Sequence, residues 1–188
     1  MYVVFNIQTC EDCFPVSLCM QVVSVCGQVI TEEVFHIKPR HYLQRKYIDE
    51  RNDGTIRTVN VCTALKYLFA YTSENAVYVT IRKRDCVNAI MVAIAHLYLN
   101  NMMETDEAEY MFKQLIYIMV HSHCLSTNAL SYVGLPSPNE NQLFSYPTIT
   151  DLCDRFHVQY EHETHPLGLV SLASQCYFIG RELGVYWF

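Results

Sequence analysis

The sequence predicts a single α/β domain, residues 1–188, in which a mixed five-stranded sheet is flanked by helices. A chain of 188 residues suits one domain and can bury a substantial core. Its composition, 51% hydrophobic and 17% charged, is typical of a folded globular protein rather than a disordered one. Three strand-like segments are followed by segments of helical and strand periodicity in alternation, which favours a sheet packed against helices.

The first three segments predict an antiparallel meander. Apolar and β-branched runs at residues 1–10, 17–26 and 29–37 read as strands, with a tight turn at Gly27 between the last two. Pro39 has no amide hydrogen for a strand ladder and ends the third strand. The polar residues that follow, 40–58, predict a surface loop with room for one helical turn.

The remaining segments predict helices with two further strands between them. Residues 76–81 read as the fourth strand and 115–120 as the fifth, while 104–114 predict a helix or an acidic connector. Asp85 and Thr148 stand where a carboxylate or a capping hydroxyl stabilises a helix N-terminus. Helices are expected at four segments: 59–71, 85–99, 148–156 and 167–183.

Two segments stand apart from this pattern. Residues 134–147 contain three prolines and several Asn and Ser residues, which predicts a loop insertion. Residues 184–188 are apolar, so we expect this tail to pack on the body of the domain or, if exposed, to form a dimer or partner contact.

Charge and composition limit the function classes. The formal net charge is −6, so nucleic-acid binding would need a local basic face. No apolar run reaches about 18 residues and residues 1–10 lack a basic leader, which predicts a soluble intracellular protein, in cytoplasm or nucleus, with no membrane partner. Nine scattered cysteines favour reduced, buried thiols over a disulfide framework. Heavy Tyr, Cys, Met and Asn usage hints at an AT-rich viral genome.

The first strand carries two polar residues, Asn6 and Gln8, on one of its faces. Residues 3–9 read Val-Val-Phe-Asn-Ile-Gln-Thr, which resembles the first motif of the DnaQ-like (DEDD) 3′–5′ exonucleases, Val-Val-Phe-Asp-Ile-Glu-Thr. Residues 35–39 (Phe-His-Ile-Lys-Pro) and 152–158 (Leu-Cys-Asp-Arg-Phe-His-Val) are similar to scaffold segments of the same family. The order of elements also resembles that of the RNase H-like exonuclease fold over nearly the whole chain.

The resemblance implies a site that uses four carboxylates to bind two Mg²⁺ ions about 4 Å apart, with a histidine as general base. Asn6 and Gln8 then stand at two carboxylate positions as amides, and Asp85 keeps the third. Residues 165–171 resemble the last motif, which makes His165 the histidine and places Val170 or Ser171 where the fourth carboxylate belongs. Catalytic positions Asn6, Gln8, Asp85 and His165 therefore predict a degenerate site.

Cofactor expectations follow from this degeneracy. We expect no cofactor, or Mg²⁺ or Mn²⁺ if residual activity remains. Amides at Asn6 and Gln8 would also suit an engineered variant. Natural loss is favoured, since Val170 and Ser171 show that the last motif lacks its aspartate too.

Other residues suggest competing sites. Cys10 and Cys13 form a Cys-x-x-Cys pair, and residues 121–124 (His-Ser-His-Cys) add soft ligands, so zinc is an alternative, as in Maelstrom-type domains, which resemble this case of lost carboxylates. Scattered core thiols and exposed histidines are the simpler interpretation. A cysteine nucleophile with a histidine base remains open, without a particular pair. His157, His162 and His165 crowd one loop, which is pH-sensitive or simply exposed.

A basic run, Arg82-Lys83-Arg84, lies beside the expected cleft and is the candidate phosphate contact. A solvated charge run is the alternative. A further basic edge is suggested by four residues: Arg40, Arg45, Lys46 and Arg51.

The sequence therefore predicts a catalytically degenerate exonuclease-like protein that binds single-stranded nucleic acid or a protein partner, with a homodimer through the tail at residues 185–188 as a further option. The alternative is an enzyme: a residual or metal-altered nuclease, or an active exonuclease with substituted carboxylates, that uses Asp85 and His165 or a zinc ion held by Cys and His.

Overall fold

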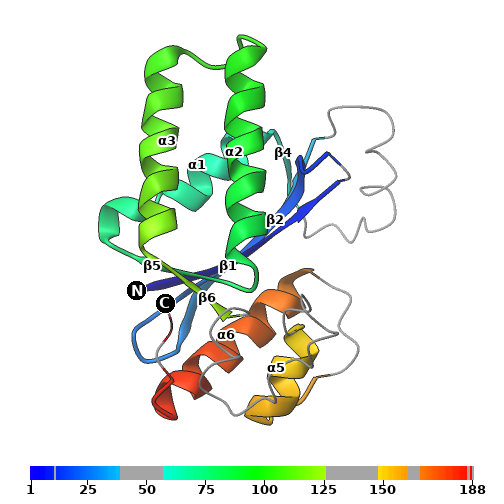
Figure 1. Cartoon of the computed structure of the whole chain (residues 1–188), viewed down its shortest axis with the longest axis vertical. Coiled ribbons are helices and arrows are strands. Elements are labelled where there is room, and N and C mark those ends of the chain that lie inside the picture. Colours follow the sequence, from blue (N-terminus) through cyan, green and yellow to red (C-terminus); the bar gives the residue numbers. More distant parts are fainter. Residues whose placement is uncertain (11, 39–56, 126–147, 161–165, 186, 188) are drawn as a thin grey trace, which may run out of the picture.

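The structure is a computed structural model that describes residues 1–10, 12–38, 57–125, 148–160, 166–185 and 187. It has an α/β architecture with a central mixed sheet and helices on both faces (Figure 1). The strands are β1 (Tyr2–Thr9), β2 (Pro15–Val23), β3 (Val29–Ile37), β4 (Arg57–Val59), β5 (Val77–Thr80) and β6 (Ser122–Cys124). The helices are α1 (Val61–Phe69), the 3₁₀ turn η2 (Thr72–Glu74), α2 (Lys83–Leu99), α3 (Thr105–Val120), α5 (Ile149–Phe156) and α6 (Pro166–Glu182).

The sheet has the strand order β4-β3-β2-β1-β5-β6. β1, β2 and β3 form an antiparallel meander, whereas β5 and β6 run parallel to β1. Because parallel strands end on the same side, β1, β5 and β6 all point their carboxyl ends toward one edge of the sheet.

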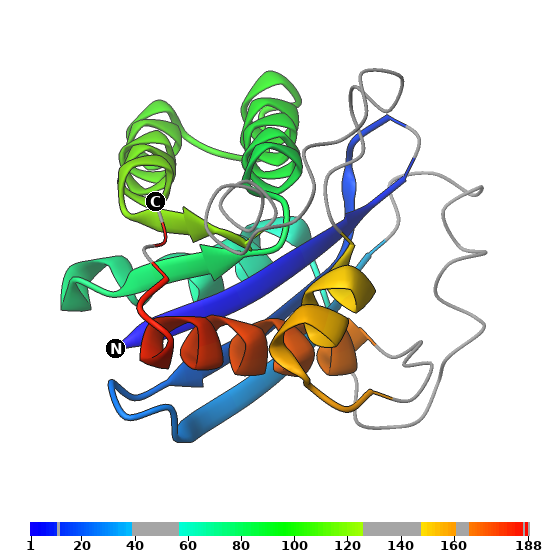
Figure 2. The same ribbon diagram turned by 60° about the horizontal axis from the view of Figure 1, so that its bottom comes forward.

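The alternation of side chains along β1 separates two cores. Val3, Phe5 and Ile7 point into a core shared with α1, α2 and α3, whereas Val4 belongs to a second core beneath α5 and α6. The two views show these helix groups on opposite faces of the sheet (Figures 1 and 2). Asn6 and Gln8 follow Val4 in the alternation, so they lie on the face covered by α5 and α6.

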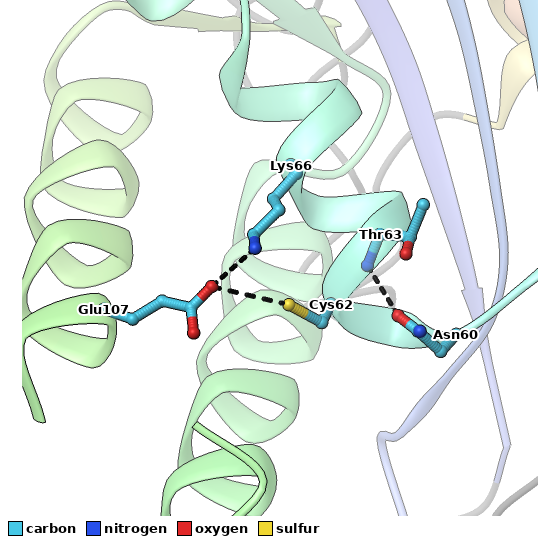
Figure 3. Close-up of polar contacts among 5 residues, drawn as sticks. All are labelled: Asn60, Cys62, Thr63, Lys66 and Glu107. Atoms are coloured by element: carbon cyan, nitrogen blue, oxygen red, sulfur yellow. Dashed lines mark hydrogen bonds and ion pairs between the residues drawn. The ribbon is translucent and has the colours of Figure 1, made fainter. Parts of the chain in front are cut away.

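Local contacts explain where two of the helices begin. Asn60 caps α1 by accepting a hydrogen bond from the amide of Thr63 at 2.7 Å, and Lys66 then joins α1 to Glu107 of α3 at 2.6 Å (Figure 3). α5 starts with a capping box, in which the hydroxyl of Thr148 and the carboxylate of Asp151 accept each other's backbone amides. The cap predicted at Thr148 is confirmed.

The α/β class is confirmed, but two predictions about strands were wrong. Residues 115–120 form the last part of α3 rather than a strand, because Ala108, Met111, Leu115 and Ile118 are buried at helical spacing along all of α3. A short strand, β6, does follow this helix, but it begins at Ser122. The sheet has six strands among the described residues rather than five, since the last two residues of the predicted loop, Arg57 and Thr58, and the first of the predicted helix, Val59, pair with β3 as β4.

The apolar tail packs partly on the body of the domain. Trp187 is buried against Phe156 and Tyr177 in the second core. Of the nine cysteines, Cys13 and Cys26 are exposed and five are buried: Cys19, Cys86, Cys124, Cys153 and Cys176. The expected loop insertion at 134–147 lies outside the described residues. No helix in the described part of the chain has the length and apolar character needed to cross a membrane.

Candidate functional site

A pocket of about 430 Å³ lies at the carboxyl ends of β1 and β5, between the two groups of helices. Its walls come from β1 and the turn after it, the start of α2, the start of α5 and one residue of α6. The lining residues are Asn6, Ile7, Thr9, Cys13, Ile81, Arg82, Asp85, Cys86, Asn88, Thr148, Ile149 and Leu169.

Strand register brings two of the predicted site residues to this pocket. β1 and β5 are parallel neighbours in which Phe5 pairs with Thr80, so Asn6 lies beside the point where the chain leaves β5. α2 begins three residues after Thr80 and carries Asp85 in its first turn. The amide of Asn6 and the carboxylate of Asp85 therefore line the same pocket, although they come from distant parts of the sequence.

The described lining of the pocket has a charge balance close to neutral. Asp85 supplies the one carboxylate in its described lining, and the guanidinium of Arg82 lies 3.8 Å from that carboxylate. Both side chains are more than half exposed, at 60% and 56%, so water screens the pair.

This donor set does not fit a pair of Mg²⁺ ions. Such ions need several hard, negatively charged oxygen ligands, and the described lining provides a single carboxylate, which an arginine already neutralises. Among the residues that the structure describes, no group of three or more His, Cys, Asp or Glu side chains converges as a metal site.

Gln8 points its amide into the β1–β2 hairpin instead of the pocket. The hydroxyl of Ser17, its cross-strand neighbour, donates a hydrogen bond to Gln8 Oε1 at 2.9 Å. The carbonyl oxygen that would have to replace a carboxylate is therefore already an acceptor within the hairpin.

The start of α6 presents an apolar side chain to the pocket. Leu169 is part of the lining, while Val170 is fully buried in the second core and Ser171 is half-buried outside the described lining. The residue types at this wall can exclude water from part of the pocket but cannot bind a metal ion. His165 lies outside the described residues.

The three basic residues after β5 have different surroundings. Arg82 lines the pocket, whereas Lys83 donates a hydrogen bond from Nζ to the backbone carbonyl of Ser122 at 3.1 Å and so ties α2 to β6. Arg84 is exposed and is not part of the pocket lining. The predicted basic edge at Arg40, Arg45, Lys46 and Arg51 lies outside the described residues.

The candidate zinc ligands near β6 point in different directions. Nδ1 of His123 and the hydroxyl of Tyr177 form a hydrogen bond of 2.8 Å. Burial lowers the pKa of the His123 imidazole, and the positive charges of Lys83 and Arg181 lower it further. His121 stacks on Tyr117 with ring centroids 4.3 Å apart. Cys124 donates to a backbone carbonyl, that of Ile81, at 3.6 Å. His157 is the C-cap of α5, and His162 lies outside the described residues.

Several lining residues were not singled out from the sequence. Asn88 follows Asp85 by three residues on a helix, and this spacing places both side chains on one face. Thr148 was recognised only as a helix cap, and Thr9 only as part of the β1 motif. Cys86 is unsuited to nucleophilic chemistry at neutral pH, since burial raises the pKa of its thiol to about 11.

No family model, curated protein or solved structure matches this chain.

Proposed function

We propose that this chain is a degenerate relative of the DnaQ-like exonucleases, with an RNase H-like fold, and that its pocket binds single-stranded nucleic acid without cleaving it. The order of elements supports the family relationship: a meander (β1, β2, β3), then α1, β5, the two helices α2 and α3, β6 and further helices. The short β4 is an addition to that order.

The observation that carries the proposal is the pairing of Asp85 with Arg82 in a pocket whose described lining is otherwise uncharged. In an active exonuclease the negative charge of several carboxylates repels a phosphate until metal ions neutralise it. Here the guanidinium offsets the single described carboxylate, so a phosphate meets little repulsion and has one cation to bind.

The uncharged part of the lining suits the rest of a nucleotide. Asn6 and Asn88 offer amide donors and acceptors, and the hydroxyl of Thr9 can donate or accept a hydrogen bond. Such groups hydrogen-bond to sugars, phosphates and base edges. Ile81 and Leu169 provide apolar surface against which a base can pack.

The test is the affinity of the purified chain for fluorescent single-stranded DNA and RNA oligonucleotides across a salt series. We expect binding that weakens as salt rises, because counterions are released from phosphates. The Arg82→Gln variant should bind about fivefold to tenfold more weakly, with a salt slope reduced by about one. Arg84→Gln is the matched control, since Arg84 lies two residues away and outside the pocket lining, and it should have a smaller effect.

Two results would contradict this proposal. If neither DNA nor RNA oligonucleotides bind at low salt, nucleic acid is excluded as the ligand and a protein partner is favoured. Equal weakening by Arg82→Gln and Arg84→Gln would place binding on a general basic surface rather than in the pocket.

A residual nuclease is the second candidate, favoured by the presence of Asn6 and Asp85 in one pocket. An amide oxygen and one carboxylate are weak ligands for Mn²⁺ but can bind it at high concentration. Trimming of a labelled oligonucleotide that requires Mn²⁺ and disappears in Asp85→Ala would establish this candidate. Stoichiometric zinc in the purified protein would overturn the metal-free interpretation as well.

A further inference from the structure

Cys10 and Cys13 lie at the two ends of a closed turn between β1 and β2. The amide of Cys13 donates a hydrogen bond to the carbonyl oxygen of Cys10 at 3.0 Å. A turn closed in this way holds its first and fourth Cα atoms within about 7 Å, and disulfides span about 4.4–6.8 Å between Cα atoms. The backbone therefore already holds the two cysteines at a spacing compatible with a disulfide.

The two thiols differ in access and in their contacts. Cys13 is exposed and lines the rim of the pocket, whereas Cys10 is half-buried. The thiol of Cys10 donates to the carbonyl oxygen of Phe14 at 3.3 Å and also to the carboxylate of Asp12. Asp12 is fixed there by accepting the amide of Phe14 at 3.3 Å. A proton acceptor is thus held beside the less accessible thiol.

Zinc binding does not account for this pair in the described structure, because no third and fourth ligand converge on it among the residues described. Zinc held by protein side chains needs three or four such ligands. Thiol–disulfide chemistry needs only the two cysteines and an oxidant.

We propose that Cys10 and Cys13 form a reversible intramolecular disulfide at the rim of the pocket, with a small-molecule disulfide such as oxidised glutathione as the oxidant. The thiolate of the exposed Cys13 attacks the oxidant, which breaks its S–S bond, releases one glutathione thiol and leaves a mixed disulfide on Cys13. Cys10 then passes its proton to Asp12 and attacks Cys13 Sγ, which forms the Cys10–Cys13 bond and releases the second glutathione. Two protein thiols are oxidised and one disulfide is reduced to two thiols.

The position of the pair favours reversibility. The disulfide closes a loop of only a few residues, so it removes little chain entropy from the unfolded state. Its exposure lets a thiol reach it, and exposed disulfides are the labile ones in proteins.

The test equilibrates the full-length chain in glutathione buffers of rising oxidised fraction, traps remaining thiols by alkylation, and measures intact mass and disulfide-linked peptides. We expect a species that takes up two alkyl groups fewer than the fully reduced chain, is linked between Cys10 and Cys13, and reverts when reduced glutathione is added. Cys10→Ser should instead accumulate a glutathione adduct on Cys13. Cys26→Ser is the matched control, since Cys26 is an exposed thiol in the β2–β3 turn, and it should still form the bond.

The location of the bond decides the outcome. Buried Cys153 and Cys176, with sulfurs 3.8 Å apart, are the competing pair. A linkage found there and not at Cys10–Cys13, or glutathione adducts on Cys13 in the wild-type chain at every buffer ratio, would overturn the proposal. Neither readout depends on what the pocket binds.

Discussion

The two faces of the central sheet are built differently although β1 contributes to both. One face is covered by α1, α2 and α3, and β1 contributes the apolar side chains of Val3, Phe5 and Ile7 to its core. The other is covered by α6 and the eight-residue α5, and there β1 changes from Val4 to Asn6 and Gln8. Of these two polar residues, Asn6 lines the pocket, whereas Gln8 accepts a hydrogen bond from Ser17 within the hairpin. The difference is greatest at the pocket, where α2 from the first face meets α5 and α6 from the second.

The largest expected effect tests whether the faces unfold independently. Leu68→Ala, in the first core, should lower the free energy of unfolding by about 3 kcal/mol, because truncating a fully buried leucine leaves a cavity. Leu152→Ala removes an equally buried side chain from α5 in the second core. We expect Leu152→Ala to accelerate amide hydrogen exchange mainly in α5, as local opening. Equal acceleration in α2 would show that both faces form one cooperative unit.

A smaller effect is expected where α6 meets the C-terminal tail. A Cβ at Gly180 would overlap Trp187 Cζ2, so Gly180→Ala should displace the indole and lower the free energy of unfolding by about 2 kcal/mol. Trp187 is the single tryptophan of the chain, so its fluorescence should shift to the red as the ring is exposed. Gly184→Ala is a control: it adds strain at a φ of +79° but meets no atom within 4 Å, so stability should fall without the spectral shift.

The capping box of α5 should contribute about 1 kcal/mol, the typical loss when a capping threonine becomes alanine. Hydrogen bonds from Thr148 lower the pKa of the Asp151 carboxyl. A lowered pKa means that this carboxyl stabilises the fold when ionised, above its unfolded value of about 3.9. The stability difference between wild type and Thr148→Ala should therefore be full at neutral pH and shrink as the pH falls below about 4. A difference that is constant down to pH of about 2 would remove Asp151 from the explanation.

The smallest effect is expected on the first face, at the contact between Lys66 and Glu107 (Figure 3). Lys66 is 59% exposed, so Lys66→Gln should cost about 0.5 kcal/mol or less despite the short distance. The loss should disappear in high salt, because screening already weakens the pair in the wild-type chain. Lys113→Gln, at an exposed position on α3, controls for the change in net charge. A loss above about 1 kcal/mol would mean that the pair orders α1 against α3.

The sequence predicted the elements whose pattern is long and internally consistent. The apolar and β-branched runs predicted β1 and β3 closely and the cap at Thr148 placed the start of α5. The second strand was predicted at 17–26, but β2 begins two residues earlier and ends three residues earlier, at Val23. Residues 115–120 were predicted as a strand because a short apolar run is compatible with either a strand or a helix. The helical spacing of buried residues from Ala108 onward shows that they belong to a helix. β4 and β6 have three residues each, too few to show any alternation.

The pocket was less predictable than the fold. Sequence similarity pointed to Asn6 and Asp85, and the parallel register of β1 and β5 explains why both reach one place. The roles of Gln8 and Lys83 could not be deduced, because each depends on a partner from a separate strand, Ser17 or Ser122. Leu169 likewise reaches the pocket only through the packing of α6.

The short outer strands have a consequence for how this protein meets its neighbours. An exposed strand edge recruits other strands, and long, flat edges promote aggregation or β-strand addition by a partner. In the described structure β4 and β6 form the two edges with three residues each, and β4 begins with a charged residue, Arg57. β4 pairs only with Phe35, His36 and Ile37, so residues 29–34 of β3 have no neighbouring strand on that side within the described part of the chain. A partner that extends the sheet would therefore pair with this part of β3 rather than with β4 or β6.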